Sequence, residues 1–239
     1  MKAEAVDYKE GSTGLEGWVA YDDAKPGKRP GVLLFSDWTG VGDYAKKRAA
    51  MLVDLGYAVF CADVYGKGVR PSGQDPQACT AEMMKYLKDR PLLRSRAKAG
   101  LEQLKALPVV DSKVGAIGYC FGGLCGLELA RTGADIAGIV GFHCNLNTPN
   151  PADAKNIKAK VLVLNGADDP VVPDSETQAF EKEMRDAKVD WQLVRYGNTV
   201  HGYTQWYIPP GGNQAAYYEP SDKRSWVAMQ SFFKEIFGG

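Results

Sequence analysis

The stretch Val114-Gly115-Ala116-Ile117-Gly118-Tyr119-Cys120-Phe121-Gly122-Gly123 decides how the rest of the chain is interpreted. Its first half is apolar, as a buried strand is, and the residues after it have helical spacing up to Gly133. Between the two lies the pattern G-x-C-x-G, which is typical of a nucleophile elbow with cysteine in place of serine. Glycines belong there because side chains two residues either side would collide with the nucleophile or the neighbouring strand. The helix start also favours a thiolate, so Cys120 is the predicted nucleophile.

Short apolar runs alternate with helical patterns, which predicts an α/β fold: a mostly parallel sheet with helices on both faces. The runs expected as strands are 31–35, 57–61, 113–117, 136–142, 160–164 and 191–196. The segments expected as helices are 44–55, 94–107, 121–132, 175–187 and 222–237. Residues 15–21 are expected to add an antiparallel edge hairpin. No repeat or linker interrupts these elements, so 1–239 is expected to form a single domain.

The composition excludes several classes of partner. Lys+Arg and Asp+Glu each total 29, so the formal charge is zero and neither nucleic acid nor an anionic membrane is indicated. No apolar run approaches the ~20 residues of a membrane span, and the polar N-terminus is unlike a signal peptide. The five cysteines form no C-x-x-C pair and no Cys/His set for zinc. We therefore expect a cytoplasmic monomer or homodimer with free thiols, no metal and no cofactor.

The chain has two histidines, His143 and His201, as candidates for the catalytic base. In α/β-hydrolases the order along the chain is nucleophile, acid, histidine, and only His201 fits it. We expect His143 to be a pocket wall or a satisfied polar residue. After the strand that ends at Leu164, Asp168 and Asp169 are both candidate acids, and residue chemistry alone does not separate them. The acid would orient the imidazole, whose other nitrogen would act as base and then as acid.

A third acid, Asp37, follows the expected strand 31–35. In this fold the loop after that strand supplies an N–H group to the oxyanion hole beside the nucleophile. We therefore expect the backbone N–H groups of Trp38 and Phe121 to form the oxyanion hole. Asp37 is then placed to hydrogen-bond the thiol of the resting enzyme, and the alternative is a plain turn aspartate.

The long loop 202–221 begins directly after His201 and is rich in aromatic residues, glycine and proline. Long loops in compact domains are often functional, so we place Tyr203 and Trp206 in the substrate pocket together with His143. The alternative is that these aromatics only pack the loop onto the surface. The sequence leaves open whether the loop moves as a lid.

Five tracts together resemble the dienelactone hydrolase family, and the similarity extends over nearly the whole chain. They are 37–41, 56–65, 118–123, 166–173 and 201–203. The resemblance implies an α/β-hydrolase fold, a triad of Cys120, Asp169 and His201, and no metal. It also selects Asp169 over Asp168, because the second acid matches the triad aspartate of the family.

Two departures from the family pattern concern activation and substrate. The activating acid of the family is usually glutamate, whereas Asp37 is one methylene shorter. Members that cleave dienelactone hold the substrate carboxylate with two arginines, and the matching positions here are Glu82 and Gln205, the latter in the substrate pocket. Without that cationic clamp, neutral aryl esters or lactones fit better than dienelactone itself. The arginines that remain are Arg70, Arg94 and Arg96, and nothing in the sequence places them in the pocket.

The leading interpretation is hydrolysis of neutral carboxylic esters or lactones through a thioester at Cys120. The same thiolate and oxyanion hole could attack a neutral phosphotriester as a side activity, so small esters, lactones and phosphotriesters are the expected partners. A thioesterase or acyltransferase would share the triad and differ in the acceptor. An alternative from another class is a non-catalytic redox-sensing thiol protein, for which Cys125 is the nearest resolving cysteine.

Overall fold

The structure, a computed structural model, describes residues 1–238. The chain divides into two compact units, the first running from Met1 to Ile117 and the second beginning at Gly118. The expectation of one domain over 1–239 stays a prediction, and its last residue, Gly239, lies outside the described residues.

The first unit contains strands that pair in the order β1-β2-β4-β3. β1 (Lys2–Glu10) and β2 (Thr13–Tyr21) form an antiparallel hairpin. β4 (Ala58–Ala62) pairs antiparallel with β2 and parallel with β3 (Arg29–Phe35). The hairpin at 15–21 is therefore confirmed, but its partner β1 was not expected, because that strand is mostly exposed and polar and carries no apolar run.

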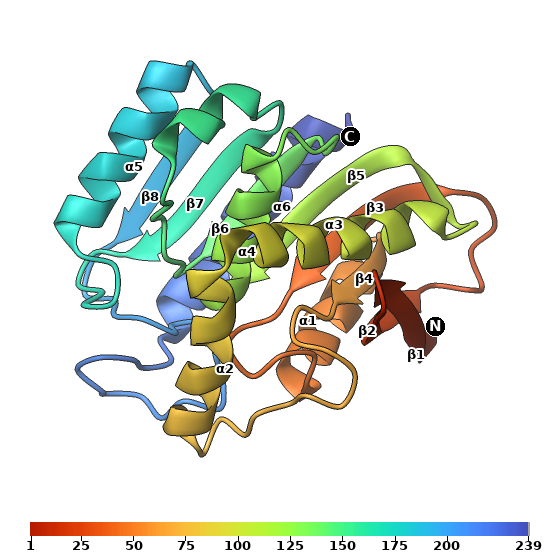
Figure 1. The fold of residues 1–239 in the computed structure, drawn as a ribbon, viewed down its shortest axis with the longest axis horizontal. Helices are drawn as coiled ribbons and strands as arrows, with labels where there is room; N and C mark the ends of the chain where they lie inside the picture. The colour runs from red at the N-terminus through yellow and green to blue at the C-terminus, as the bar shows by residue number, and fades with distance from the viewer. Residues whose placement is uncertain (239) are drawn as a thin grey trace. The chain divides into compact units, whose positions relative to one another are not determined.

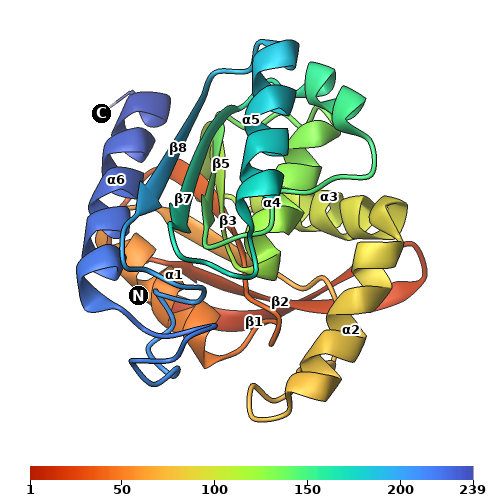
Figure 2. The same cartoon turned by 90° about the vertical axis from the view of Figure 1, so that its left-hand side faces the viewer.

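Two helices of the first unit, α1 (Asp43–Asp54) and α3 (Arg90–Ala106), pack on opposite faces of β4 (Figures 1 and 2). Successive strand residues point to opposite faces. The Cys61 thiol lies 3.9 Å from the Ala45 carbonyl of α1, whereas a Cβ built at Gly100 of α3 would lie 2.6 Å from the Ala62 side chain. Because one helix covers each face, β4 is buried along its whole length.

A third helix, α2 (Pro76–Lys88), was missed by sequence reasoning. Its start carries a recognisable pattern, because Asp75 accepts a hydrogen bond from Ala78 N at 3.0 Å and Pro76 occupies the first helical position. The Gly- and Pro-rich segment before it obscured that pattern, so the sequence predicts no element between residue 75 and the helix expected at 94–107.

The second unit contains the parallel strands β6 (Gly138–Phe142), β7 (Lys160–Gly166) and β8 (Trp191–Tyr196). β5 (Val110–Tyr119) runs across the boundary between the two units. The helices of this unit are α4 (Phe121–Arg131), the 3-10 helix η1 (Pro151–Asn156), α5 (Asp174–Ala187) and α6 (Glu219–Phe237). Figure 2 shows α6 on one side of β7 and β8 and α5 on the other, so the expected arrangement of a parallel sheet between helices is confirmed within this unit.

A buried ion cluster joins α4 to α5. The Arg131 guanidinium donates to both carboxylate oxygens of Glu183 at 2.8 Å and to Glu128 at 3.0 Å. It also donates to the Leu146 carbonyl at 2.8 Å, and its side chain is fully buried. Because α4 begins at the predicted nucleophile, this cluster fixes the helix that carries it.

We expect Arg131→Met to lower the free energy of unfolding by about 3–5 kcal/mol, because it leaves two buried carboxylates without their cation. Arg185→Met on α5 is the matched control, since Arg185 is 66% exposed and lies 3.9 Å from Glu181; it should change stability by less than ~0.5 kcal/mol. Urea unfolding of both variants measures the difference. Equal losses in the two proteins would contradict the role given to the cluster.

Candidate active site

The turn between β5 and α4 is strained in the way that a nucleophile elbow requires. Cys120 is the N-cap residue of α4 and adopts φ 54° and ψ −122°, a conformation uncommon for residues other than glycine. A Cβ built at Gly118 would lie 2.1 Å from the Gly122 carbonyl oxygen, so only glycine fits there. A Cβ built at Gly123 would lie 2.3 Å from the Cys144 Cβ atom. Close backbone approach therefore explains Gly118 of the motif, and the neighbouring Cys144 side chain explains Gly123, which follows the motif.

The structure brings Cys120, His201 and Asp169 together in the second unit. Each follows the carboxyl end of a strand, and parallel strands end at the same edge of a sheet. His201 Nε2 lies 3.1 Å from Cys120 Sγ, and His201 Nδ1 lies 2.8 Å from Asp169 Oδ2. This is the geometry of a nucleophile, a base and the carboxylate that orients the base.

Asp169, and not its exposed neighbour Asp168, contacts the imidazole. Its other carboxylate oxygen accepts hydrogen bonds from Val171 N at 2.8 Å and Val172 N at 3.3 Å. The Asp169 side chain is fully buried and is held by the backbone of the turn. It therefore presents Oδ2 to His201 in a fixed orientation.

The environment of His201 favours its charged form. Burial acts to lower the pKa of His201, but the charge of Cys120 and the hydrogen bonds to Asp169 and Cys120 outweigh it and raise the pKa to about 10. The arrangement can thus supply a sulfur nucleophile and, beside it, an imidazolium that can donate a proton to a leaving group.

His143 packs against His201. It is fully buried, adopts φ 37°, and its ring meets the ring of His201 edge-on with centroids 5.2 Å apart. His143 Nε2 lies 2.7 Å from Thr204 Oγ1, a contact that no local sequence pattern indicates. Tyr203 is also fully buried, 5.2 Å from the His143 ring, and donates to the Leu164 carbonyl at 2.8 Å. His143 therefore packs directly on the predicted base, His201, and Tyr203 packs on His143.

The loop after His201 ends earlier than the predicted 202–221, because α6 already begins at Glu219, and backbone hydrogen bonds anchor the loop at both ends. Ala216 N donates to His201 O at 3.0 Å, and Tyr218 N donates to Tyr203 O at 3.1 Å. Gln205 is 2% exposed, whereas Trp206 is 36% exposed and donates to Asp222 at 3.1 Å. Of the predicted pocket residues in this loop, Trp206 is thus the one with an accessible aromatic surface.

Two further candidates, Asp37 and Trp38, belong to the first unit. Asp37 is 1% exposed, and its Oδ1 accepts hydrogen bonds from Thr39 N at 2.9 Å and Thr39 Oγ1 at 2.6 Å. The Trp38 carbonyl accepts a hydrogen bond from the Tyr65 hydroxyl at 3.0 Å. The oxyanion hole of Trp38 and Phe121 and the contact of Asp37 with the thiol stay predictions.

A separate cavity of about 290 Å³ lies between η1 and α5, and Leu146, Pro151, Glu176 and Phe180 are among its lining residues. None of the predicted site residues lines it. Within residues 1–238, no cluster of three or more His, Cys, Asp or Glu side chains could hold a metal ion. In the same range, no helix is long and apolar enough to cross a membrane.

Parallel strands that lead into a cysteine elbow, an aspartate turn and a histidine loop, in that order, define an α/β-hydrolase. Comparison with known proteins makes the assignment narrower. The profile of the dienelactone hydrolase family matches residues 15–237, and the chain belongs to that family. The family resemblance seen in the sequence is confirmed.

Two curated relatives and one solved structure illustrate the match. The structure, titled as a dienelactone hydrolase-like promiscuous phosphotriesterase P91 from metagenomic libraries, is 43% identical with a TM-score of 0.93, covering 99% of this chain and 98% of that one. A protein of Bradyrhizobium sp named "Probable 2-oxo-3-(5-oxofuran-2-ylidene)propanoate lactonase" is 28% identical over 83% of this chain and 84% of its own length. The carboxymethylenebutenolidase of Pseudomonas putida is 25% identical over 64% of this chain and 67% of its own. The α/β-hydrolase fold is confirmed, and the chain is a hydrolase of the dienelactone hydrolase and lactonase type, acting on ester bonds.

Replacing Cys120 should change the titration of His201. In Cys120→Ala the charge and hydrogen bond of Cys120 are gone while burial remains, so the pKa of His201 should fall from about 10. NMR titration of the two histidine Cε1–H signals measures the shift. Cys125→Ala, at a buried cysteine of the same helix, is the control and should leave the titration unchanged. A His201 signal that titrates at one pH in all three proteins would contradict the effect of Cys120 on the pKa of His201.

Proposed function

We propose that this chain is a cysteine-nucleophile hydrolase of neutral carboxylic esters or lactones that works through a thioester at Cys120. The observation that carries the proposal is the continuous contact from Cys120 Sγ to His201 Nε2 at 3.1 Å and from His201 Nδ1 to Asp169 Oδ2 at 2.8 Å. It is supported by the left-handed conformation of Cys120, which the packing around the elbow maintains.

In the first step the Cys120 thiolate attacks the acyl carbon, and a bond forms between sulfur and carbon. Negative charge moves to the carbonyl oxygen, for which we propose the backbone N–H groups of Trp38 and Phe121 as donors. The tetrahedral intermediate collapses and the bond to the alcohol oxygen breaks. That oxygen takes the proton of His201 Nε2, which leaves a thioester and a neutral imidazole.

In the second step His201 Nε2 takes a proton from water, and the resulting hydroxide attacks the thioester carbon. Collapse of the second intermediate breaks the carbon–sulfur bond, releases the carboxylic acid and regenerates the thiolate beside the imidazolium. Asp169 keeps the imidazole in the tautomer that both steps need. We retain Asp37 as the acid that hydrogen-bonds the thiol in the resting enzyme, which its burial inside the loop at 36–42 supports.

We favour uncharged substrates because Arg70 and Arg96 already bind oxygen atoms of the protein and are not free to bind a substrate carboxylate. Each of the three guanidinium nitrogens of Arg70 already donates to carbonyl or carboxylate oxygens within the first unit. Arg96 is buried and forms an ion pair with Glu10 at 3.5 Å. Glu82, where dienelactone-cleaving relatives have arginine, forms an ion pair with Lys85. We therefore propose a pocket formed by His143, Tyr203, Gln205 and Trp206 that takes an apolar aryl or lactone group.

Phosphotriester hydrolysis is the second candidate activity, because the 43% identical relative is titled a promiscuous phosphotriesterase. A thiolate beside an oxyanion hole can attack phosphorus as well as carbon. A thioesterase, an acyltransferase and a redox-sensing thiol protein remain the alternatives. A cytoplasmic location is supported by five free cysteines, which a reducing compartment maintains, and we propose a monomer or homodimer of one domain.

Hydrolysis of 4-nitrophenyl butyrate tests the nucleophile. We expect turnover by the wild type and a loss of at least ~10³-fold in kcat for Cys120→Ala and for His201→Ala, because the residues of such a unit act together. Cys125→Ala should keep wild-type activity. Full activity in Cys120→Ala would refute the proposal. An inert wild type whose Cys120 is consumed by mild peroxide would favour the redox sensor.

A matched pair of esters tests the charge of the substrate. Mono-4-nitrophenyl succinate carries a free carboxylate, and its methyl ester is the neutral counterpart with the same reacting bond. We expect kcat/KM to be about tenfold or more higher for the neutral ester, because a carboxylate would be desolvated without a cation to pair with it. The uncatalysed rates of both esters are the control. Preference for the charged ester would show that an arginine reaches the pocket.

A further inference from the structure

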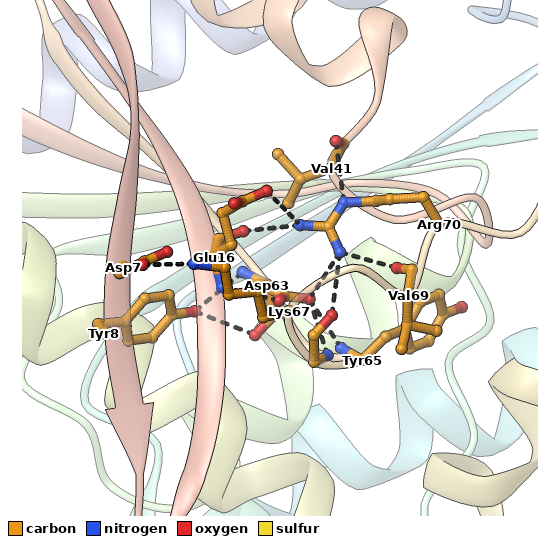
Figure 3. Close-up of polar contacts among 10 residues, drawn as sticks. Asp7, Tyr8, Glu16, Val41, Asp63, Tyr65, Lys67, Val69 and Arg70 are labelled. Atoms are coloured by element: carbon orange, nitrogen blue, oxygen red, sulfur yellow. Dashed lines mark hydrogen bonds and ion pairs between the residues drawn. The ribbon is translucent and has the colours of Figure 1, made fainter.

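The side chains of Tyr65 and Arg70, from the segment after β4, form hydrogen bonds with the loop 36–42, which carries the proposed oxyanion donor. The Tyr65 hydroxyl donates to the Trp38 carbonyl at 3.0 Å, and Arg70 Nε donates to the Val41 carbonyl at 3.2 Å. Figure 3 shows Arg70 spanning from Val41 to the turn that contains Tyr65. Both contacts lie within the first unit and join residues that are 27 and 29 positions apart in sequence.

The loop 36–42 also contains internal hydrogen bonds, which do not use the carbonyl groups of Trp38 and Val41 that Tyr65 and Arg70 bind. Gly40 N donates to Asp37 O at 3.2 Å, and Thr39 N donates to the Asp37 carboxylate at 2.9 Å. Gly40 has φ 77°, and a Cβ there would lie 3.3 Å from the Tyr65 ring and 3.4 Å from Arg70 Cδ. The two side chains thus touch the tip of the loop as well as its carbonyl groups.

The Arg70 guanidinium is fully engaged in this arrangement. Nη1 and Nη2 donate to the backbone oxygens of Val69 at 2.7 Å, Gly66 at 3.2 Å and Glu16 at 2.7 Å. Nη1 also lies 3.4 Å from the Asp63 carboxylate. A guanidinium whose nitrogens all point at main-chain oxygens fixes backbone and has little capacity to bind a substrate.

Asp63 connects Tyr65 and Arg70 to the hairpin of β1 and β2. Its carboxylate is fully buried and accepts hydrogen bonds from Tyr65 N, Gly66 N and Glu16 N, each at 3.0 Å. The Tyr8 hydroxyl of β1 donates to Asp63 O at 3.0 Å and accepts from Asp63 N at 2.9 Å. Burial, followed by the charge of Asp63, raises the pKa of Tyr8 well above its usual range, so the phenol stays protonated and can donate. Figure 3 shows the continuous set of contacts from Tyr8 to Val41.

We propose that Tyr65 and Arg70 are positioning residues that hold the Trp38 backbone in the orientation needed to stabilise the oxyanion. The inference rests on the proposed function, because it gives the loop 36–42 its catalytic task. Oxyanion donors act only when preorganised to within a few tenths of an ångström, and loosening them raises the barrier without weakening ground-state binding. Neither residue touches the reacting atoms in this account, and each acts through the loop.

Tyr65→Phe removes a single hydroxyl and is the main test variant. We expect kcat for 4-nitrophenyl butyrate to fall about tenfold, less than the ~10²–10³ of deleting a whole donor, with KM within about twofold. Alkylation of Cys120 by iodoacetamide, which develops no oxyanion, should keep its wild-type rate. Tyr21→Phe, at the far end of β2, is the control and should change neither quantity.

Amide hydrogen exchange of the peptide that contains 36–42 gives a readout that does not depend on turnover. Exchange should become faster in Tyr65→Phe and in Arg70→Lys, and not in Tyr21→Phe. Unchanged exchange, or an unchanged kcat in an active Tyr65→Phe enzyme, would overturn the inference alone. Wild-type protein that hydrolyses no ester would instead overturn the proposed function, while the exchange result still decides whether these side chains order the loop.

Discussion

The backbone at Cys120 holds a φ of 54°, which costs a residue other than glycine of order 1–3 kcal/mol and persists only where its surroundings demand it. Those surroundings are specific. Cys120 N donates to Phe142 O at 2.9 Å, which ties the elbow to the end of β6. The loop that follows β6 is fixed to β7, because the Asn165 side chain accepts a hydrogen bond from Cys144 N at 2.9 Å and donates one to Cys144 O at 3.0 Å. The strain at the nucleophile is thus balanced by close backbone contacts to two neighbouring strands, and every proposed catalytic contact in the second unit starts from that fixed point.

Sulfur at this position changes the electrostatics of the site. A serine would stay neutral until the base removes its proton, whereas a thiol ionises more readily than a hydroxyl. Burial acts to lower the pKa of His201, but its contacts with Cys120 and Asp169 outweigh burial and raise that pKa to about 10. In the proposed mechanism, the Cys120 thiolate needs no general base for acylation, and the His201 imidazolium protonates the departing alcohol. The demand on His201 is greatest in the second step, when it must accept a proton from water. The orientation of its ring by Asp169 and by the edge of His143 therefore matters most during hydrolysis of the thioester.

The sequence predicts most of this arrangement because its main constraints are local. Gly118, Cys120 and the flanking strand and helix form one short pattern, and the buried parallel strands appear as apolar runs. β1 and α2 escaped detection because one is a polar edge strand and the other starts after a Gly- and Pro-rich segment. Residue chemistry alone left Asp168 and Asp169 equivalent, since only the turn geometry decides which carboxylate meets the imidazole. Long-range partners such as Arg131 with Glu183 have no sequence pattern, because they depend on how α4 and α5 pack.

The long-range contacts of the arginines also have no sequence pattern, and in the proposed function they affect which substrates the protein can bind. Nothing in the sequence places Arg70 in the pocket, and in the structure its Nη atoms bind the carbonyl oxygens of Gly66, Val69 and Glu16 and the Asp63 carboxylate. A cation used in this way stabilises backbone geometry and contributes little net charge to a pocket, because Asp63 and Glu16 lie within 3.8 Å of it. Within the first unit, then, positive charge serves to order the loop at 36–42. In the proposed mechanism, Arg70 therefore contributes to the rate by fixing the loop that carries an oxyanion donor, and the affinity for a neutral substrate comes from apolar contacts.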